Sequence, residues 1–215
     1  MSVIVLSGTI GAGKTSLSKM IADELSSDVF FESVEGNDIL PLFYENPEKY
    51  SFLLQIYFLN KRFKSIKQAL ANENNVLDRS IYEDSLLFHL NADLGRASAL
   101  EVEVYDELLQ NMMEELPFAA KKKHPDLLVH ISVSFETMLK RIKKRNRPFE
   151  QISFDPSLYD YYKELNNRYH QWYEDYDESP KIQIDGDRYD FIENPEAGKE
   201  VVALVVEALA SIRQS

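Results

Sequence analysis

Gly8-Thr9-Ile10-Gly11-Ala12-Gly13-Lys14-Thr15 is the stretch that decides the fold. It follows a short apolar run, Val3-Ile4-Val5-Leu6, and precedes a segment, 15–26, whose apolar residues recur at helical spacing. A strand, a glycine-rich loop and a helix in this order are typical of a phosphate-binding loop, in which backbone N–H groups surround phosphate oxygens. The positive end of the helix dipole points at the same anion. The stretch therefore predicts a nucleoside triphosphate site.

Two side chains of this loop have predicted chemical roles. Lys14 is expected to reach the β- and γ-phosphates, and Thr15 to offer its hydroxyl to Mg²⁺. A glycine-rich turn that merely joins a strand to a helix is the alternative, but the constrained positions of the motif are all present in the right context. The predicted triphosphate-binding residues of the loop are Gly8, Thr9, Ile10, Gly11, Ala12, Gly13, Lys14, Thr15 and Ser16.

Composition excludes several classes of partner. The net charge of −12 argues against nucleic acid or an anionic membrane as the main partner. The chain has no cysteine, which excludes disulfides and thiolate metal sites. No apolar run is long enough to span a membrane, and the N-terminus lacks the features of a secretory signal. We therefore expect a cytoplasmic protein.

Short apolar runs alternate with segments of helical periodicity along the chain. The predicted strands are Val3–Ser7, Val29–Phe31, Val76–Leu77, Leu127–Ile131 and Lys181–Asp185. The predicted helices cover 15–26, 37–45, 49–72, a segment through Phe88, 99–116, a segment from Phe135, 156–177 and 196–213. This alternation predicts an α/β fold: a five-stranded parallel sheet with helices on both faces. Because no repeat or linker is present, residues 1–215 are expected to form a single domain.

In such sheets ligands bind beyond the carboxyl ends of the strands, so residues that follow different strands converge there. Asp78 follows the third strand and is a candidate Mg²⁺ ligand, although Asp is also a common helix N-cap. Glu32 follows the second strand and is placed to accept a proton from an acceptor hydroxyl, with Glu35 as a competitor. Arg79 is expected to pair with Glu32 and contact phosphate.

Six of the eight residues from 140 to 147 are Lys or Arg in an otherwise acidic protein. On a helix Arg141 and Arg145 share a face, and Arg147 follows in a loop. Guanidinium groups over a triphosphate neutralise the charge that develops during phosphoryl transfer. A solvated basic face is the alternative. With the glycine loop present, we favour a mobile lid over about 141–152.

The acceptor is harder to infer from the residues alone. Gln55 and Arg62 lie about two helical turns apart on nearly one face, and a glutamine amide pairs well with a base edge. Asp84 and Phe88 form another pair on one face, one polar and one flat. These residues suit a planar heterocycle, but buried glutamines and core phenylalanines are also common.

Six motifs in a fixed order together resemble the deoxynucleoside kinases, above all the bacterial deoxyadenosine/deoxyguanosine kinases. The motifs are Gly8–Thr15, Glu32-Ser33-Val34, Tyr44-Glu45-Asn46-Pro47, Gln55 with Arg62, Asp78-Arg79-Ser80 with Asp84, and Arg141, Arg145, Arg147 with Glu150. The resemblance implies transfer of the γ-phosphate of ATP or another nucleoside triphosphate to the 5′-hydroxyl of a deoxynucleoside, with Mg²⁺. It also implies a homodimer joined through helices, for which 52–66 and 99–116 are candidates.

The resemblance assigns roles residue by residue. Glu32 matches the general base and Arg79 its partner, while Thr15 and Asp78 match the metal-side residues. Gln55, Arg62 and Asp84 match the base-recognition set, with Phe88 at the stacking position. Tyr44 and Glu150 match the contacts to the sugar 3′-hydroxyl, and Arg141, Arg145 and Arg147 match the lid. Asp78 and Ser33 depart from relatives that carry Glu and Pro at these positions.

Two other classes of function remain as alternatives. A nucleoside monophosphate kinase of the thymidylate-kinase type has the same loop and lid, but Glu32 would repel its phosphorylated acceptor. A nucleotide-dependent switch or binding module would need neither Glu32 nor the lid arginines. The preferred deoxynucleoside is not determined by the residues, although the resemblance favours a purine.

Overall fold

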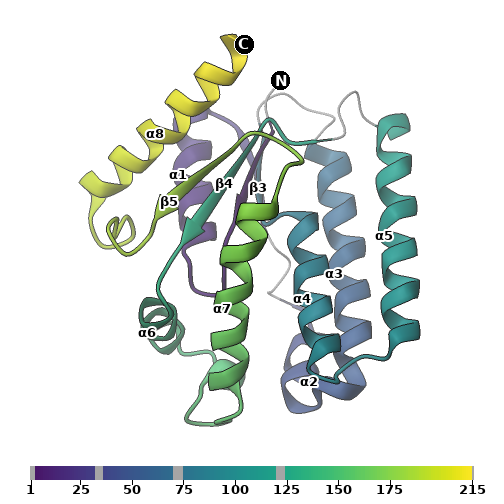
Figure 1. Ribbon diagram of the computed structural model, residues 1–215. Coiled ribbons are helices and arrows are strands. Elements are labelled where there is room, and N and C mark those ends of the chain that lie inside the picture. The colour runs from purple at the N-terminus through teal and green to yellow at the C-terminus, as the bar shows by residue number, and fades with distance from the viewer. Residues whose placement is uncertain (1–2, 32–35, 70–74, 120–123, 215) are drawn as a thin grey trace.

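A five-stranded sheet forms the centre of the computed structural model, which describes residues 3–31, 36–69, 75–119 and 124–214 (Figure 1). All its strands are parallel and their order is β2-β3-β1-β4-β5. The strands are β1 (Val3–Ser7), β2 (Asp28–Phe30), β3 (Asn75–Asp78), β4 (Leu127–Ser132) and β5 (Lys181–Asp185). The predicted α/β fold with a five-stranded parallel sheet is confirmed.

Helices connect the strands on both sides. They are α1 (Lys14–Leu25), α2 (Ile39–Glu45), α3 (Pro47–Ala69), α4 (Ile81–Asp93), α5 (Ala99–Ala119), α6 (Phe135–Arg145), the short 3₁₀ helix η1 (Pro148–Glu150), α7 (Leu158–Asp175) and α8 (Pro195–Gln214). Helix α3 begins at Pro47 because proline is well suited to a first helical turn. Helix α5 ends at Ala119, three residues beyond the predicted end at 116.

Side chains that alternate along β1 bury two cores, one on each face of the sheet. Ile4 and Leu6 pack in one cluster with residues of α1 and α8, and Val3 and Val5 in another with residues of α3 and α5. Figure 1 shows α1 and α8 on one side of the sheet, with α3, α4 and α5 neighbouring one another beyond it. Burial on both faces explains why β1 and β4 read as largely apolar runs, whereas the edge strands β2 and β5 are partly exposed and carry polar residues. None of the helices in the described ranges is long and apolar enough to cross a membrane.

His130 is a buried polar residue on β4, directly beside the end of β1. The β1–β4 register pairs it with Ser7, whose hydroxyl lies 2.9 Å from its Nδ1. Its ring stacks on Tyr173 of α7 at 4.8 Å and 19°. Burial, with the positive charges of His170, Lys14 and Lys181, lowers the pKa of His130 to about 3. The imidazole is therefore neutral in the folded protein and joins α7 to the sheet just below the glycine loop.

We predict that His130 makes the fold acid-sensitive. Its pKa is about 6.5 in the unfolded chain and about 3 in the folded one, so its stabilisation is complete above pH 6.5 and is lost as the pH falls toward 3. Between pH 7 and 5 the wild type should lose about 2 kcal/mol more free energy of unfolding than a His130→Phe variant, which keeps an aromatic ring but does not titrate. Urea unfolding at both pH values measures this difference. Equal losses in the two proteins would show that His130 binds a proton when folded.

Candidate active site

A cleft of about 1180 Å³ lies beyond the carboxyl ends of the strands. Its lining comes from the glycine loop after β1, from Asp78 at the end of β3 and Arg79 directly after it, from the segment after β5, and from α2, α3 and α6. Ligand pockets for one small molecule measure roughly 300–1000 Å³. The cleft therefore has room for two ligands side by side. It lies beyond the carboxyl ends of the strands, where ligands bind in parallel sheets of this kind.

The glycine loop forms one end of this cleft. Gly8, Gly11 and Gly13 have φ values of 139°, 78° and 104°, in the region that favours glycine. Helix α1 begins at Lys14, directly after the loop. The Lys14 ammonium donates to the carbonyl oxygens of Gly8 at 2.6 Å and Thr9 at 3.0 Å. The predicted strand, loop and helix are present, with the lysine folded over the loop.

Thr15 and Asp78 come together although they are far apart in the sequence. The Thr15 hydroxyl donates to Asp78 Oδ2 at 2.6 Å. Asp78 does not cap the following helix, because the N-cap of α4 is Ser80. Its second oxygen, Oδ1, is buried without a hydrogen-bond partner among the described residues. A hydroxyl beside a carboxylate with one unsatisfied oxygen fits Mg²⁺, which takes few protein ligands and completes its shell with water and phosphate.

Basic residues of α6, and Arg147 shortly after it, face the same cleft. Arg141, Arg145 and Arg147 all line it, as do Lys140 and Lys144. Arg141 donates to the Ala12 carbonyl of the glycine loop and to the Gly186 carbonyl after β5, both at 2.8 Å. Arg141 therefore ties α6 to the loop.

Arg145 and Arg147 instead pair with the buried carboxylate of Glu150, at 2.5 Å and 3.3 Å. Tyr44 of α2 lies near this group, with its ring centroid 5.2 Å from that of Phe149 and the two rings tilted by 34°. Burial raises the pKa of Tyr44 well above its ordinary value, and neighbouring Tyr162 and Glu150 raise it further. The Tyr44 hydroxyl therefore keeps its proton and can donate a hydrogen bond beside Glu150.

The predicted base-recognition residues lie on α3 and α4, where Arg62 and Asp84 are not among the residues that line the cleft. Arg62 and Asp84 form a buried, bidentate ion pair, with Nε–Oδ2 at 3.1 Å and Nη2–Oδ1 at 3.3 Å. Gln55 lines the cleft, and its Oε1 is buried with no hydrogen-bond partner among the described residues. An unsatisfied buried acceptor beside a cavity suits a ligand that donates a hydrogen bond.

Phe88 occupies a different place from these residues. It is fully buried and packs against Tyr105 and Phe52, with ring centroids 4.7 Å and 6.1 Å away. It is not among the cleft-lining residues. The aromatic side chains that do line the cleft among the described residues are Phe31, Phe43, Phe58 and Tyr161.

Glu32, the predicted general base, and Glu35 lie outside the described residues. Strand β2 ends at Phe30, and Phe31 lines the cleft, so the chain reaches the cleft directly before Glu32. Arg79 also lines the cleft and has a positive φ of 112°, unusual for a side-chain-bearing residue. Its Nη1 donates to the Tyr169 hydroxyl at 2.7 Å and lies 3.5 Å from Glu83.

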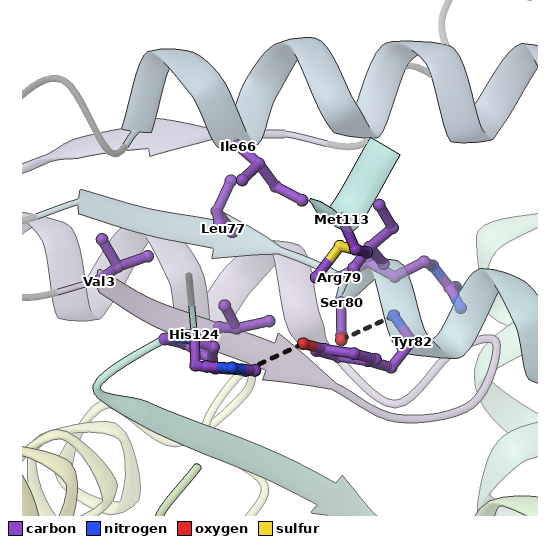
Figure 2. A pocket seen from close by; sticks show the side chains of 11 residues that line it. Val3, Ile66, Leu77, Arg79, Ser80, Tyr82, Met113 and His124 are labelled. Atoms are coloured by element: carbon purple, nitrogen blue, oxygen red, sulfur yellow. Dashed lines mark hydrogen bonds between the residues drawn. The ribbon is translucent and has the colours of Figure 1, made fainter. Parts of the chain in front are cut away.

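A second cavity is lined by Arg79, Ser80 and apolar side chains, on the side of the sheet covered by α3 and α5 (Figure 2). Its rim includes Tyr82, whose hydroxyl is 3.2 Å from Nδ1 of His124. The volume is about 30 Å³, which holds about two waters. This cavity is too small for a nucleoside, so the large cleft is the candidate active site.

Sequence reasoning missed two parts of the site. Gly186, Asp187, Asp190 and Ile192, which follow β5, line the cleft beside α6. The rule that ligands bind beyond the carboxyl ends of parallel strands could have predicted these residues, because Asp185 ends a predicted strand. Glu83 and Tyr169 beside Arg79 were also missed, and only the spacing of Ser80 and Glu83, that of a capping box, gave a signal.

The fold and the cleft together define a P-loop kinase. The sequence as a whole is more specific: residues 4–210 match the deoxynucleoside kinase family. The chain is 60% identical to a deoxyguanosine kinase of Lactobacillus johnsonii, covering 97% of this chain and 93% of that protein. It is 53% identical to a deoxyadenosine kinase of Lactobacillus acidophilus, covering 99% and 98%.

Solved structures agree with the sequence matches. The deoxyadenosine kinase of M. mycoides with bound dATP superposes with a TM-score of 0.78 at 30% identity, covering 97% of this chain and 99% of that one. The chain therefore belongs to the deoxynucleoside kinase family. This confirms the predicted family over the thymidylate-kinase type and over a switch without an acceptor.

Proposed function

We propose that the protein transfers the γ-phosphoryl group of ATP to the 5′-hydroxyl of a purine deoxynucleoside, deoxyguanosine or deoxyadenosine, in nucleotide salvage. One observation carries the proposal: a single cleft is lined by Lys14, Thr15 and Asp78 and also by Gln55, which shares helix α3 with Arg62 of the buried Arg62–Asp84 pair. The relatives named for deoxyguanosine and deoxyadenosine support the purine. The whole chain, 1–215, acts as one catalytic domain.

At the donor end, backbone N–H groups of the glycine loop and the Lys14 ammonium bind the β- and γ-phosphates. Thr15 and Asp78 hold Mg²⁺, which when bound offsets phosphate charge. Arg141, already fixed between Ala12 and Gly186, adds a guanidinium beside the same phosphates. The segment 141–152 is the lid, and its closure brings Arg145 and Arg147 over the donor.

At the acceptor end, Glu32 takes the proton of the 5′-hydroxyl as the oxygen attacks the γ-phosphorus. Arg79 stabilises the charge on the phosphoryl oxygens. The support for Glu32 is indirect: the chain lines the cleft at Phe31, one residue earlier. Tyr44 and Glu150 bind the sugar 3′-hydroxyl, since one can donate and the other accept a hydrogen bond.

The base lies between Gln55 and the Arg62–Asp84 pair. Arg62 holds the Asp84 carboxylate in a fixed orientation through two hydrogen bonds. The unsatisfied Oε1 of Gln55 accepts from an amino or imino group on the base edge, and its amide nitrogen donates to a ring nitrogen or carbonyl. Phe88 is buried against Phe52 and Tyr105 and does not line the cleft, so the aromatic rings that do line it stack on the base.

The enzyme also forms a homodimer through α3 and α5. These helices contact each other and expose apolar side chains in water: Leu100 is 68% exposed, Leu53 48% and Val104 44%. Several large apolar residues on adjacent helices are typical of a surface that another protein covers. Because α3 and α4 also carry the base-recognition residues, the dimer would hold that wall of the cleft rigid.

We predict that Glu32→Gln lowers kcat by about 10²–10⁴-fold, because the amide cannot accept the hydroxyl proton. The KM for ATP should change little, since the donor site is untouched. Steady-state assays with deoxyguanosine or deoxyadenosine, ATP and Mg²⁺ measure both constants. Glu35→Gln is the matched control and should keep its activity. If Glu35→Gln is inactive and Glu32→Gln is active, the base is Glu35.

We predict that Gln55→Ala raises the KM for the preferred purine deoxynucleoside by about 5- to 100-fold, the range expected for losing a bidentate base contact. The KM for ATP should stay the same. Gln68→Ala, an exposed position on the same helix, is the control for changes in α3 itself. A panel of the four deoxynucleosides with each variant measures the effect. An unchanged KM for every nucleoside would place the base elsewhere.

We predict that a Leu100→Glu, Val104→Glu double variant is a monomer, because two carboxylates on this face cannot be buried in an interface without partners. Sedimentation velocity of the wild type and the variant measures the change in mass. Leu204→Glu on α8, an exposed apolar position on another helix, should leave the dimer intact. A wild-type monomer, or a double variant that is still dimeric, would rule out this interface.

A further inference from the structure

The Glu83 carboxylate is a fully buried charge whose role extends beyond the start of its own helix. One oxygen, Oε2, accepts from the Ser80 backbone N–H at 2.7 Å, while the Ser80 hydroxyl accepts from Tyr82 N at 3.1 Å. This capping box is a common way to begin a helix, and Glu and Gln both serve in it. Helix capping accounts for Oε2 alone.

The other oxygen, Oε1, contacts residues that are far away in the sequence. It accepts from the backbone N–H of Gly8 at 3.1 Å and from the Tyr169 hydroxyl at 2.9 Å, and it lies 3.5 Å from Nη1 of Arg79. One carboxylate therefore joins the glycine loop, the end of β3 and helix α7. Burial raises the pKa of Glu83, whereas the charges of Arg79 and Lys14 act in the opposite direction.

The Gly8 residue that Glu83 binds also binds Lys14. A Cβ on Gly8 would lie 2.6 Å from the Ile131 carbonyl oxygen, so the backbone there is pressed against β4. The Gly8 N–H points to Glu83, and its carbonyl accepts from the Lys14 ammonium at 2.6 Å. Any displacement of Gly8 would therefore move Lys14 as well.

On the acceptor side of the site, the same carboxylate also holds Arg79 in place. Its Nη1 donates to the Tyr169 hydroxyl at 2.7 Å, and that hydroxyl donates in turn to Glu83. A hydroxyl can do both at once, so Tyr169 links the guanidinium to the carboxylate. The positive φ of Arg79 is an unfavourable backbone conformation that needs such surrounding contacts to persist.

We propose that Glu83 and Tyr169 are positioning residues, which set the place of Lys14 on the donor side relative to Arg79 on the acceptor side. The proposal rests on the proposed function, in which these two cations act on the same phosphoryl group. Glu83 and Tyr169 are not among the residues that line the cleft, so they act through Gly8 and Arg79 rather than on the substrate.

Glu83→Gln separates this role from capping. Its amide oxygen can still accept from Ser80 N, so the capping box is retained. Its NH₂ group then faces the Gly8 N–H, the Tyr169 hydroxyl and the Arg79 guanidinium. These three groups are donors and no longer have an acceptor there, and the positive charge of Arg79 no longer has a carboxylate beside it. Tyr169→Phe is a second variant that keeps the carboxylate and the cap but removes the hydroxyl between Glu83 and Arg79.

The matched control is a second capping box at the surface. Ser98 N and Ser98 Oγ both donate to Glu101 Oε2 at 2.7 Å, and Glu101 N donates to Ser98 Oγ at 3.3 Å. Glu101→Gln makes the same chemical change at the start of α5, among exposed groups. A purely structural effect of losing a capping carboxylate would appear in this variant too.

The first measurement is the split between kcat and KM. We expect Glu83→Gln and Tyr169→Phe to lower kcat by about 10- to 100-fold, the loss expected for a hydrogen bond to a charged group. The KM for ATP and for the deoxynucleoside should change less than about threefold, because both substrates still bind. Glu101→Gln should keep the wild-type kcat. Wild-type kcat in both Glu83→Gln and Tyr169→Phe would overturn the proposal.

The second measurement does not depend on the reaction. The chain has seven glycines, so selective ¹⁵N-glycine labelling gives a simple amide spectrum in which Gly8 can be assigned. We expect the Gly8 amide hydrogen to exchange faster in Glu83→Gln and to be unchanged in Glu101→Gln. An unchanged Gly8 amide in Glu83→Gln would also overturn the proposal. If the wild type phosphorylates no deoxynucleoside, the proposed function fails, and the positioning of Gly8 is still decided by this measurement.

Discussion

The space around Gly8 constrains the rest of the site. At this residue β1 ends, the backbone takes a φ of 139°, and the Ile131 carbonyl of β4 lies where a side chain would begin. Only glycine fits such a position without moving a neighbouring strand. The peptide is then held on both sides, by Glu83 at its N–H and by Lys14 at its carbonyl. The donor lysine is thereby placed relative to the sheet rather than to a flexible loop.

The parallel sheet brings other residues of the site to the same edge as Gly8. Because β1 and β3 are parallel and paired with Leu6 opposite Asp78, the carboxylate of Asp78 arrives beside the start of α1 and meets Thr15. This convergence could be predicted from the sequence, since it needs only the positions of apolar runs and the rule for strand ends. The same rule applies to Asp185 and the segment after it, which lines the donor end beside α6.

Other parts of the site could not be predicted, for physical reasons. Glu83 is visible in the sequence as a capping residue, but which groups its second oxygen binds depends on how α4 sits against α7 and the glycine loop. Phe88 has the right spacing from Asp84 to face a ligand, yet it is buried between Phe52 and Tyr105. Helical periodicity identifies a face of a helix, whereas the side chains of neighbouring helices decide whether that face meets a cavity or a core.

The distribution of charge within the cleft explains why two chemically different ligands can share it. At the donor end the hydrogen bonds of Arg141 go to the neutral carbonyls of Ala12 and Gly186, although Asp187 lies close enough to interact with its charge. Toward the acceptor end the arginines face carboxylates: Arg62 pairs with Asp84, and Arg145 with Glu150. Such pairs present hydrogen-bonding groups with little net charge.

A phosphorylated acceptor would need cations to offset its charge, but the cations Arg62 and Arg145 are already paired with Asp84 and Glu150. An uncharged nucleoside needs no such cations, and the unsatisfied amide oxygen of Gln55 can accept one of its hydrogen bonds. The arrangement of ion pairs thus suits an acceptor without phosphate, independently of which base it carries. It depends on the folded protein, because the hydrogen bonds between Arg62 and Asp84 join two separate helices, α3 and α4.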